Sequence, residues 1–67
     1  MNIGAMAKRV LAEFEEMPGM TLTVRQASRL FGLSEEVCQV VLDVLLDSSY
    51  LRQTPGGKIT LGDRVAA

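Results

Sequence analysis

The chain has 67 residues, a formal net charge of −1 and a hydrophobic fraction of 48%. A chain of this length is expected to form one domain that buries only about 60% of its unfolded surface, so its stability is marginal. The seven basic and eight acidic residues give no overall positive field that would attract nucleic acid. The high apolar fraction suggests that a partner covers some apolar surface.

Residue types that commonly carry chemistry are scarce. The sequence has one cysteine, Cys38, and no histidine, so it has neither an internal disulfide nor a zinc site built from cysteine and histidine. Asp43 and Asp47 are one helical turn apart and Ser48 precedes Ser49, but no histidine is available as a base. We therefore predict that the protein is not an enzyme and has no catalytic, cofactor-binding or metal-binding residues.

The sequence predicts a cytoplasmic protein that does not insert into membranes. Its first ten residues, MNIGAMAKRV, lack the apolar segment of a secretory signal. The longest apolar stretch is interrupted by Asp43 and is far shorter than the about 20 residues needed to cross a bilayer. A single cysteine also suits a reducing compartment.

The first helix is predicted over about residues 5–17. Its apolar residues recur at helical spacing and form the stripe Met6, Val10, Leu11, Phe14 and Met17. Pro18 and Gly19 end this helix, because proline disfavours helical conformation in the preceding residue. The β-favouring residues 21–23 then predict a brief strand.

Two more helices, over about residues 24–31 and 35–48, are predicted on either side of a tight turn. Thr23 and Gln26 have the spacing of a capping box at the start of the first of these helices. Ser34 has the position and hydroxyl of a cap for the second helix.

Small residues define the corner between these helices. Gly32 is expected to adopt a left-handed conformation, which side chains resist. Ala27 and Ser28 allow the second helix to cross closely over the first. This pattern predicts a helix-turn-helix.

The C-terminal part is predicted to form a β-hairpin over about residues 50–61, with strands over 50–54 and 58–61. In Thr54-Pro55-Gly56-Gly57, proline and glycine occupy the two central positions of a type II turn. The predicted fold class is mainly α with a small β-hairpin. The residues expected in its core are Phe14, Leu30, Phe31, Leu33, Val41, Leu42, Leu45, Leu51 and Ile59. The second helix is also expected to bury Val24 and Ala27.

Several features of residues 21–61 occur together in one known type of domain. They are the pair Ala27-Ser28, the turn Phe31-Gly32-Leu33-Ser34, the stripe Cys38, Val41, Leu42 and Leu45, and Tyr50-Leu51-Arg52 before a glycine-bearing loop. With these features the chain resembles the winged helix-turn-helix domains of bacterial transcription regulators. It is also similar to small bacterial proteins of unassigned function, with its Pro18-Gly19-Met20-Thr21-Leu22-Thr23 entry and Thr54-Pro55-Gly56-Gly57 wing. The resemblance implies one winged-helix domain over residues 1–67, with a wing over about 50–61.

The resemblance implies a transcription regulator that binds double-stranded DNA with its third helix in the major groove. The residues at positions where the family contacts phosphates are Arg25, Arg29, Arg52 and Lys58. Gln39 is the only outward residue of the third helix that is suited to reading a base. We therefore predict phosphate-dominated contacts, although residues 34–49 include four acidic residues and no basic one.

Protein interaction or dimerisation without DNA binding is the alternative prediction. Val37, Val40 and Val44 form a second apolar stripe on the third helix, beside the acidic Glu36 and Asp43. The first helix, a second copy of the chain or another protein could cover this stripe. Packing of Val37 and Val44 beneath the first or second helix is an equally favoured explanation.

Overall fold

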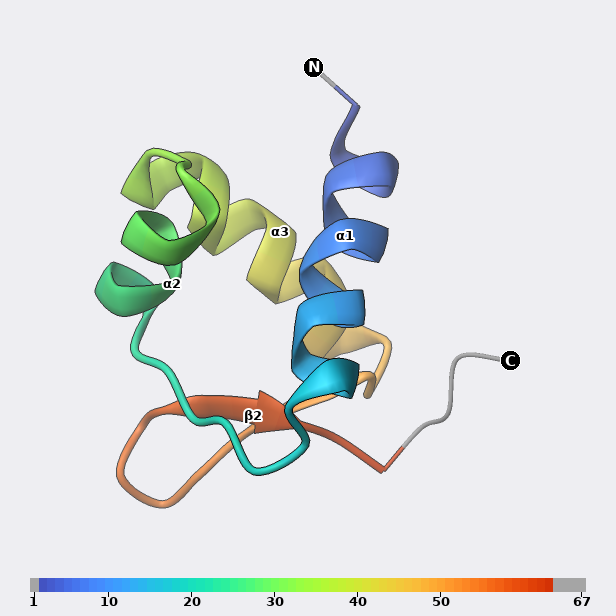
Figure 1. Ribbon diagram of the computed structural model, residues 1–67, viewed down its shortest axis with the longest axis vertical. Coiled ribbons are helices and arrows are strands. Elements are labelled where there is room, and N and C mark those ends of the chain that lie inside the picture. Colours follow the sequence, from blue (N-terminus) through green and yellow to red (C-terminus); the bar gives the residue numbers. More distant parts are fainter. Residues whose placement is uncertain (1, 64–67) are drawn as a thin grey trace.

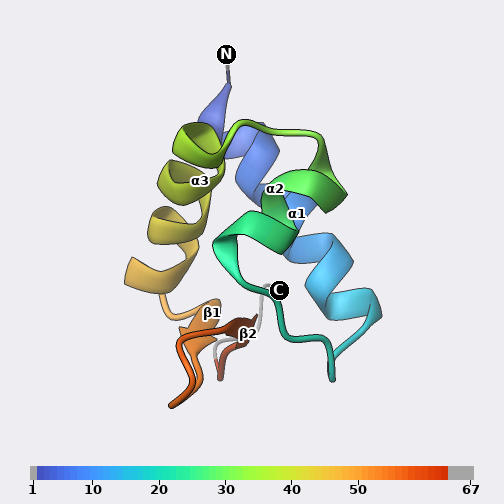
Figure 2. The same cartoon turned by 90° about the vertical axis from the view of Figure 1, so that its left-hand side faces the viewer.

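The structure is a computed structural model that describes residues 2–63. It has helices α1 (Ile3–Glu16), α2 (Val24–Phe31) and α3 (Glu35–Asp47), followed by strands β1 (Leu51–Gln53) and β2 (Ile59–Leu61). Helix α3 packs against both other helices, and the hairpin lies across one end of the helices (Figure 1, Figure 2). The predicted class, mainly helical with a small antiparallel hairpin, is confirmed.

Helix α1 begins two residues before its predicted start and ends one residue before its predicted end. Its start is fixed by Asn2, whose side chain accepts a hydrogen bond of 3.0 Å from the Ala5 N–H. Its end precedes Pro18, and Met17 has a non-helical backbone. Met17 is 58% exposed, so the prediction that it belongs to the buried stripe was wrong.

Helix α2 has the predicted bounds and cap. The Thr23 hydroxyl accepts a hydrogen bond from the Gln26 N–H at 3.1 Å, and the Gln26 side chain accepts one from the Thr23 N–H at 2.9 Å. This reciprocal pair satisfies two N–H groups that a helix start leaves without partners.

The corner after α2 also follows the prediction. Gly32 has φ +68°, and the N–H of Leu33 donates to the carbonyl of Ser28 at 2.9 Å. The Ser34 hydroxyl then accepts a hydrogen bond from the Val37 N–H at 3.2 Å and caps α3. Helix α3 ends at Asp47, one residue before its predicted end.

Strand β2 connects the hairpin to the segment between α1 and α2. Its register with β1 pairs Leu51 with Leu61. On its other side, Ile59 and Leu22 exchange two backbone hydrogen bonds of 2.9 and 2.6 Å. The buried hydroxyl of Thr60 donates to the Met20 carbonyl at 2.9 Å. The brief strand predicted over residues 21–23 is therefore a single bridge at Leu22.

The hairpin turn differs from the predicted type. The N–H of Gly57 donates to the Thr54 carbonyl at 2.9 Å, but the positive φ belongs to Gly57, at 82°, and not to Gly56. A type II turn requires a positive φ at its third residue, so this prediction was wrong. A type I turn followed by a left-handed glycine fits the geometry and the twist of the strands.

The core lies where α1, α3 and the hairpin meet. Its largest fully buried side chains are Phe14, Leu42, Leu51, Ile59, Val10, Val41 and Cys38. The rings of Phe14 and Phe31 are 6.3 Å apart and tilted, which joins α2 to α1. Like Val24, Phe31 and Leu33 are half-buried against this core and not fully inside it.

Leu30 is 58% exposed, so its prediction as a core residue was wrong. The buried stripe of α2 runs through Val24, Ala27 and Phe31, with Ser28 beside it. Leu30 lies about 100° around the helix from the centre of that stripe. Eight residues of helix bury only one narrow face, and here the small residues Ala27 and Ser28 occupy it.

Candidate interaction surfaces

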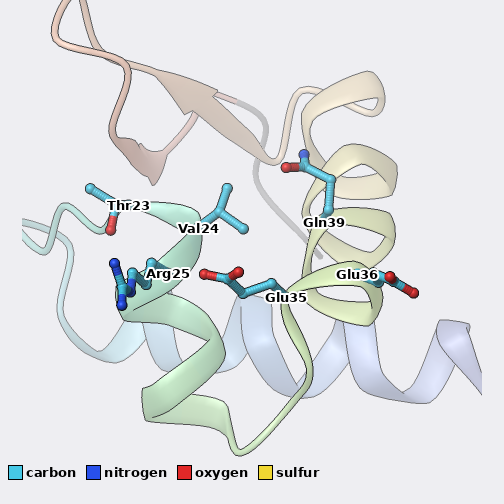
Figure 3. Close-up of a pocket in the computed structure, with 6 residues that line it drawn as sticks. All are labelled: Thr23, Val24, Arg25, Glu35, Glu36 and Gln39. Carbon is cyan, nitrogen blue, oxygen red and sulfur yellow. The ribbon is translucent and has the colours of Figure 1, made fainter.

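The first candidate surface is a shallow depression between the starts of α2 and α3. We call it the α2–α3 depression, and its lining residues are Thr23, Val24, Arg25, Glu35, Glu36 and Gln39 (Figure 3). The caps at Thr23 and Ser34 fix the two helix starts that form its sides. In Figure 3 the Glu35 side chain extends towards α2, whereas Glu36 points away from it.

The charges of this depression do not favour a nucleic acid. Two carboxylates, of Glu35 and Glu36, lie on its α3 side, and Arg25 is the only cation among the residues that line it. The Gln39 amide donates to the Asp43 carboxylate at 2.8 Å. Pairing with adenine requires both the donor and the acceptor of this amide, so Gln39 would first have to leave Asp43.

The structure brings together only two of the five predicted DNA-contacting residues, Arg25 and Gln39. Arg29 is exposed in the last turn of α2. Arg52 is exposed on β1, and Lys58 is exposed in the hairpin loop. The predicted phosphate-contacting cations therefore lie on α2 and the hairpin, whereas α3 has none.

The second candidate surface is the outer face of α3. Val40 is 49% exposed and Val44 is 41% exposed, and the neighbouring Glu36 and Asp43 are also exposed. Val37 is half-buried and packs against the core. Packing within the domain thus buries much of the Val37 side chain, but it leaves Val40 on the surface.

A groove between α1 and α3 continues this apolar surface. It has a volume of about 340 Å³ and is lined by Gly4, Ala7, Lys8, Leu11, Val44, Leu45, Ser48 and Tyr50. Val44 belongs both to the groove and to the outer face of α3. The groove was not predicted from the sequence, although two small residues on one side of α1, Gly4 and Ala7, are a signal of it.

The remaining chemical candidate, Cys38, is a core residue. Its thiol is fully buried and donates to the Val24 carbonyl at 3.8 Å. Burial, with a smaller contribution from the negative charge of Glu35, raises the pKa of this thiol. The thiol therefore stays protonated and is a poor nucleophile.

Residues 2–63 include no group of three or more His, Cys, Asp or Glu residues arranged to hold a metal ion. None of the helices in this part of the chain is long and apolar enough to cross a membrane.

Comparison with known proteins found no match to a family model, to a curated protein or to a solved structure. The resemblance to winged helix-turn-helix domains therefore stays a prediction, with which the order of three helices and a hairpin is compatible.

Proposed function

We propose that this protein is a small protein-interaction module that uses the outer face of α3. The observation that carries the proposal is Val40, a large apolar side chain that is 49% exposed. Val40 lies on the side of α3 opposite the buried Cys38 and Leu42, so no rotation of its side chain would bury it in its own domain. Exposed apolar residues that are contiguous with an apolar groove are typical of interaction sites.

The charges of α3 support a protein partner over DNA. Glu36 and Asp43 flank the exposed valines, and α3 has no basic residue. Against a DNA groove, these carboxylates would meet phosphates without any compensating cation on the same helix. Around an apolar patch, acidic residues form the polar rim that protein interfaces commonly have.

The proposal is tested with a probe of complementary chemistry, a synthetic amphipathic helix made of lysine and leucine. We expect it to shift the methyl NMR signals of Val40 and Val44 in a titration. The V40D variant should lose binding, because an unpaired charge would be buried in the interface. The matched variant L30D adds the same charge at an exposed apolar residue of α2 and should bind normally. The proposal fails if the chain neither responds to this peptide nor associates with itself.

DNA binding through phosphates is a second candidate. The observation that favours it is the exposure of the cations Arg25 and Arg29 on α2 and of Arg52 and Lys58 on the hairpin. The resemblance to winged helix-turn-helix regulators implies that residues at these positions contact the DNA backbone. Such binding would be weakly selective and sensitive to salt.

The salt dependence of binding to a DNA duplex tests this second candidate. K58A should reduce the slope of log affinity against log salt by about 0.9, the value of one phosphate contact. R9A removes an exposed cation of α1 and should leave the slope unchanged. Binding that ignores ionic strength, or no binding at low salt, would refute DNA binding by this route.

A further inference from the structure

We infer that the partner of this surface is a second copy of the same chain, related by a two-fold axis that runs along α3. This inference rests on the proposed function and names its partner. It starts from an apolar strip, which we define as Val40, Val44, Ala7 and Leu11. Val40 and Val44 are its exposed members, whereas Ala7 and Leu11 are each only 6% exposed and line the groove that Val44 also lines.

The charged residue that lines the groove is opposite in sign to the charged residues on the outer face of α3. On the α1 flank, Lys8 is the only charged residue that lines the groove. On the other flank, the exposed acidic residues of α3 are Glu36, Asp43 and Asp47. Successive residues of a helix are rotated by about 100°, so the order around α3, moving away from α1, is Val44, Val40, Asp47 and Asp43. The valines therefore separate Lys8 from the carboxylates.

This arrangement is self-complementary in one orientation. In a two-fold dimer both copies contribute the same patch, turned by 180° about the axis. The direction of the axis therefore decides which flank of one copy faces which flank of the other. An axis along the strip exchanges the flanks, and Lys8 of each copy then faces the acidic flank of the other. An axis across the strip would instead bring carboxylates against carboxylates. Charge therefore selects the dimer in which the two α3 helices run parallel.

A second copy explains features that an unrelated partner would not require. A purely basic partner would complement the acidic flank but would oppose Lys8 on the other flank. Self-association also adds stability by mass action to a chain whose 67 residues limit the size of its core.

The first experiment measures the mass of the full chain by sedimentation equilibrium, from about 1 µM to about 500 µM, a range in which a weak dimer would assemble. We expect the mass to rise from that of a monomer to that of a dimer. V40D should weaken dimerisation at least about 30-fold by burying an unpaired charge, whereas L30D should leave it unchanged. Circular dichroism should show that both variants are folded, because both side chains are exposed.

The second experiment tests the orientation by charge reversal. K8E and D47K should each weaken dimerisation, and the double variant K8E/D47K should restore it to within about twofold, because the reversed charges attract again. R9E makes the same charge change at an exposed residue of α1 that does not line the groove and should have little effect. A double variant as weak as the sum of its parts would overturn the two-fold axis along α3.

Two outcomes separate this inference from the proposed function. A chain that stays monomeric over the whole range, but whose Val40 and Val44 methyl signals shift with the lysine–leucine peptide, overturns the second copy and leaves a protein-interaction surface. A chain that stays monomeric and shows no shift overturns both.

Discussion

The two helices joined at the Gly32 corner, α2 and α3, differ in what they bury and in what they expose. Helix α2 has eight residues, and its buried side chains are the small Ala27 and Ser28. Helix α3 has 13 residues and buries Cys38, Val41, Leu42 and Leu45. Helix α2 is therefore attached to the domain by close approach of its small residues, whereas α3 is a principal part of the core.

The outer faces of the two helices differ in the kind of side chain that they present. Helix α2 presents the cations Arg25 and Arg29, whereas α3 presents valines and carboxylates. The helix that would read a DNA groove thus has the side chains least suited to it. The inner faces of the two helices thus set how they pack, while their partner is selected by outer side chains that the fold leaves free to vary.

The largest expected effect comes from one chemical change, leucine to alanine, made in each helix to compare how much the two helices contribute to the core. L42A on α3 removes a side chain with 0% exposure and should lower the free energy of unfolding by about 2–5 kcal/mol, because it leaves a cavity. L30A on α2, where the leucine is 58% exposed, should change it by less than about 0.5 kcal/mol. Urea denaturation measures both values. Equal losses would show that α2 contributes to the core as much as α3.

A second test is directed at the corner that joins the two helices. G32V should lower the free energy of unfolding by more than about 1 kcal/mol. The cost is conformational, because φ is +68° while an added Cβ would meet nothing within 4 Å. Gly19 has equal space around it and no positive φ, so G19V serves as the control, with little loss expected. Thermal denaturation of both variants would show whether strain or space decides the outcome.

The ends of the two helices give a smaller effect of opposite sign. Helix α2 ends at a glycine with positive φ, whereas the left-handed residue after α3 is Ser49, with φ +64°. S49G should therefore raise the free energy of unfolding by about 0.5–1 kcal/mol, since glycine adopts this conformation without strain. S48G, at a neighbouring residue with negative φ, should not stabilise. Stabilisation by S48G alone would contradict the strain at Ser49.

The smallest effect tests the outer faces. Neutralising the acidic flank with E36Q and D43N should strengthen any DNA binding by about twofold to fivefold per charge, as expected for exposed charges. The same changes should weaken the dimer, because Lys8 of the other copy would lose its partners. Duplex titration and sedimentation measure the two constants. Changes in the same direction in both measurements would show that the two functions do not compete for α3.

Much of the fold could be predicted from the sequence, because its signals are local. The caps at Thr23 and Ser34 and the left-handed Gly32 each depend on residues within four positions of one another, and all three predictions are confirmed. The bounds of α2 also follow from these signals. The two residues wrongly predicted to be buried, Met17 and Leu30, lie near the C-terminal ends of their helices. There, the spacing of apolar residues alone does not decide which side of the helix faces the core.

The candidate surfaces could be predicted only in part. The exposed valines and acidic residues of α3 follow from helical periodicity once the core stripe is known. The groove between α1 and α3 does not, because it depends on how closely Gly4 and Ala7 allow residues about 40 positions away to approach.

The sequence by itself determined the elements, their order and the corner between α2 and α3, because capping, helical periodicity and glycine conformation act over a few residues. Only the tertiary structure decided that the hairpin turn has its left-handed residue at Gly57, that β2 pairs with Leu22, and that Val40 and Val44 lie beside a groove with Lys8 on its far flank. These features depend on contacts between residues far apart in the chain. Local signals do not fix such contacts, because several elements have to pack together before they exist.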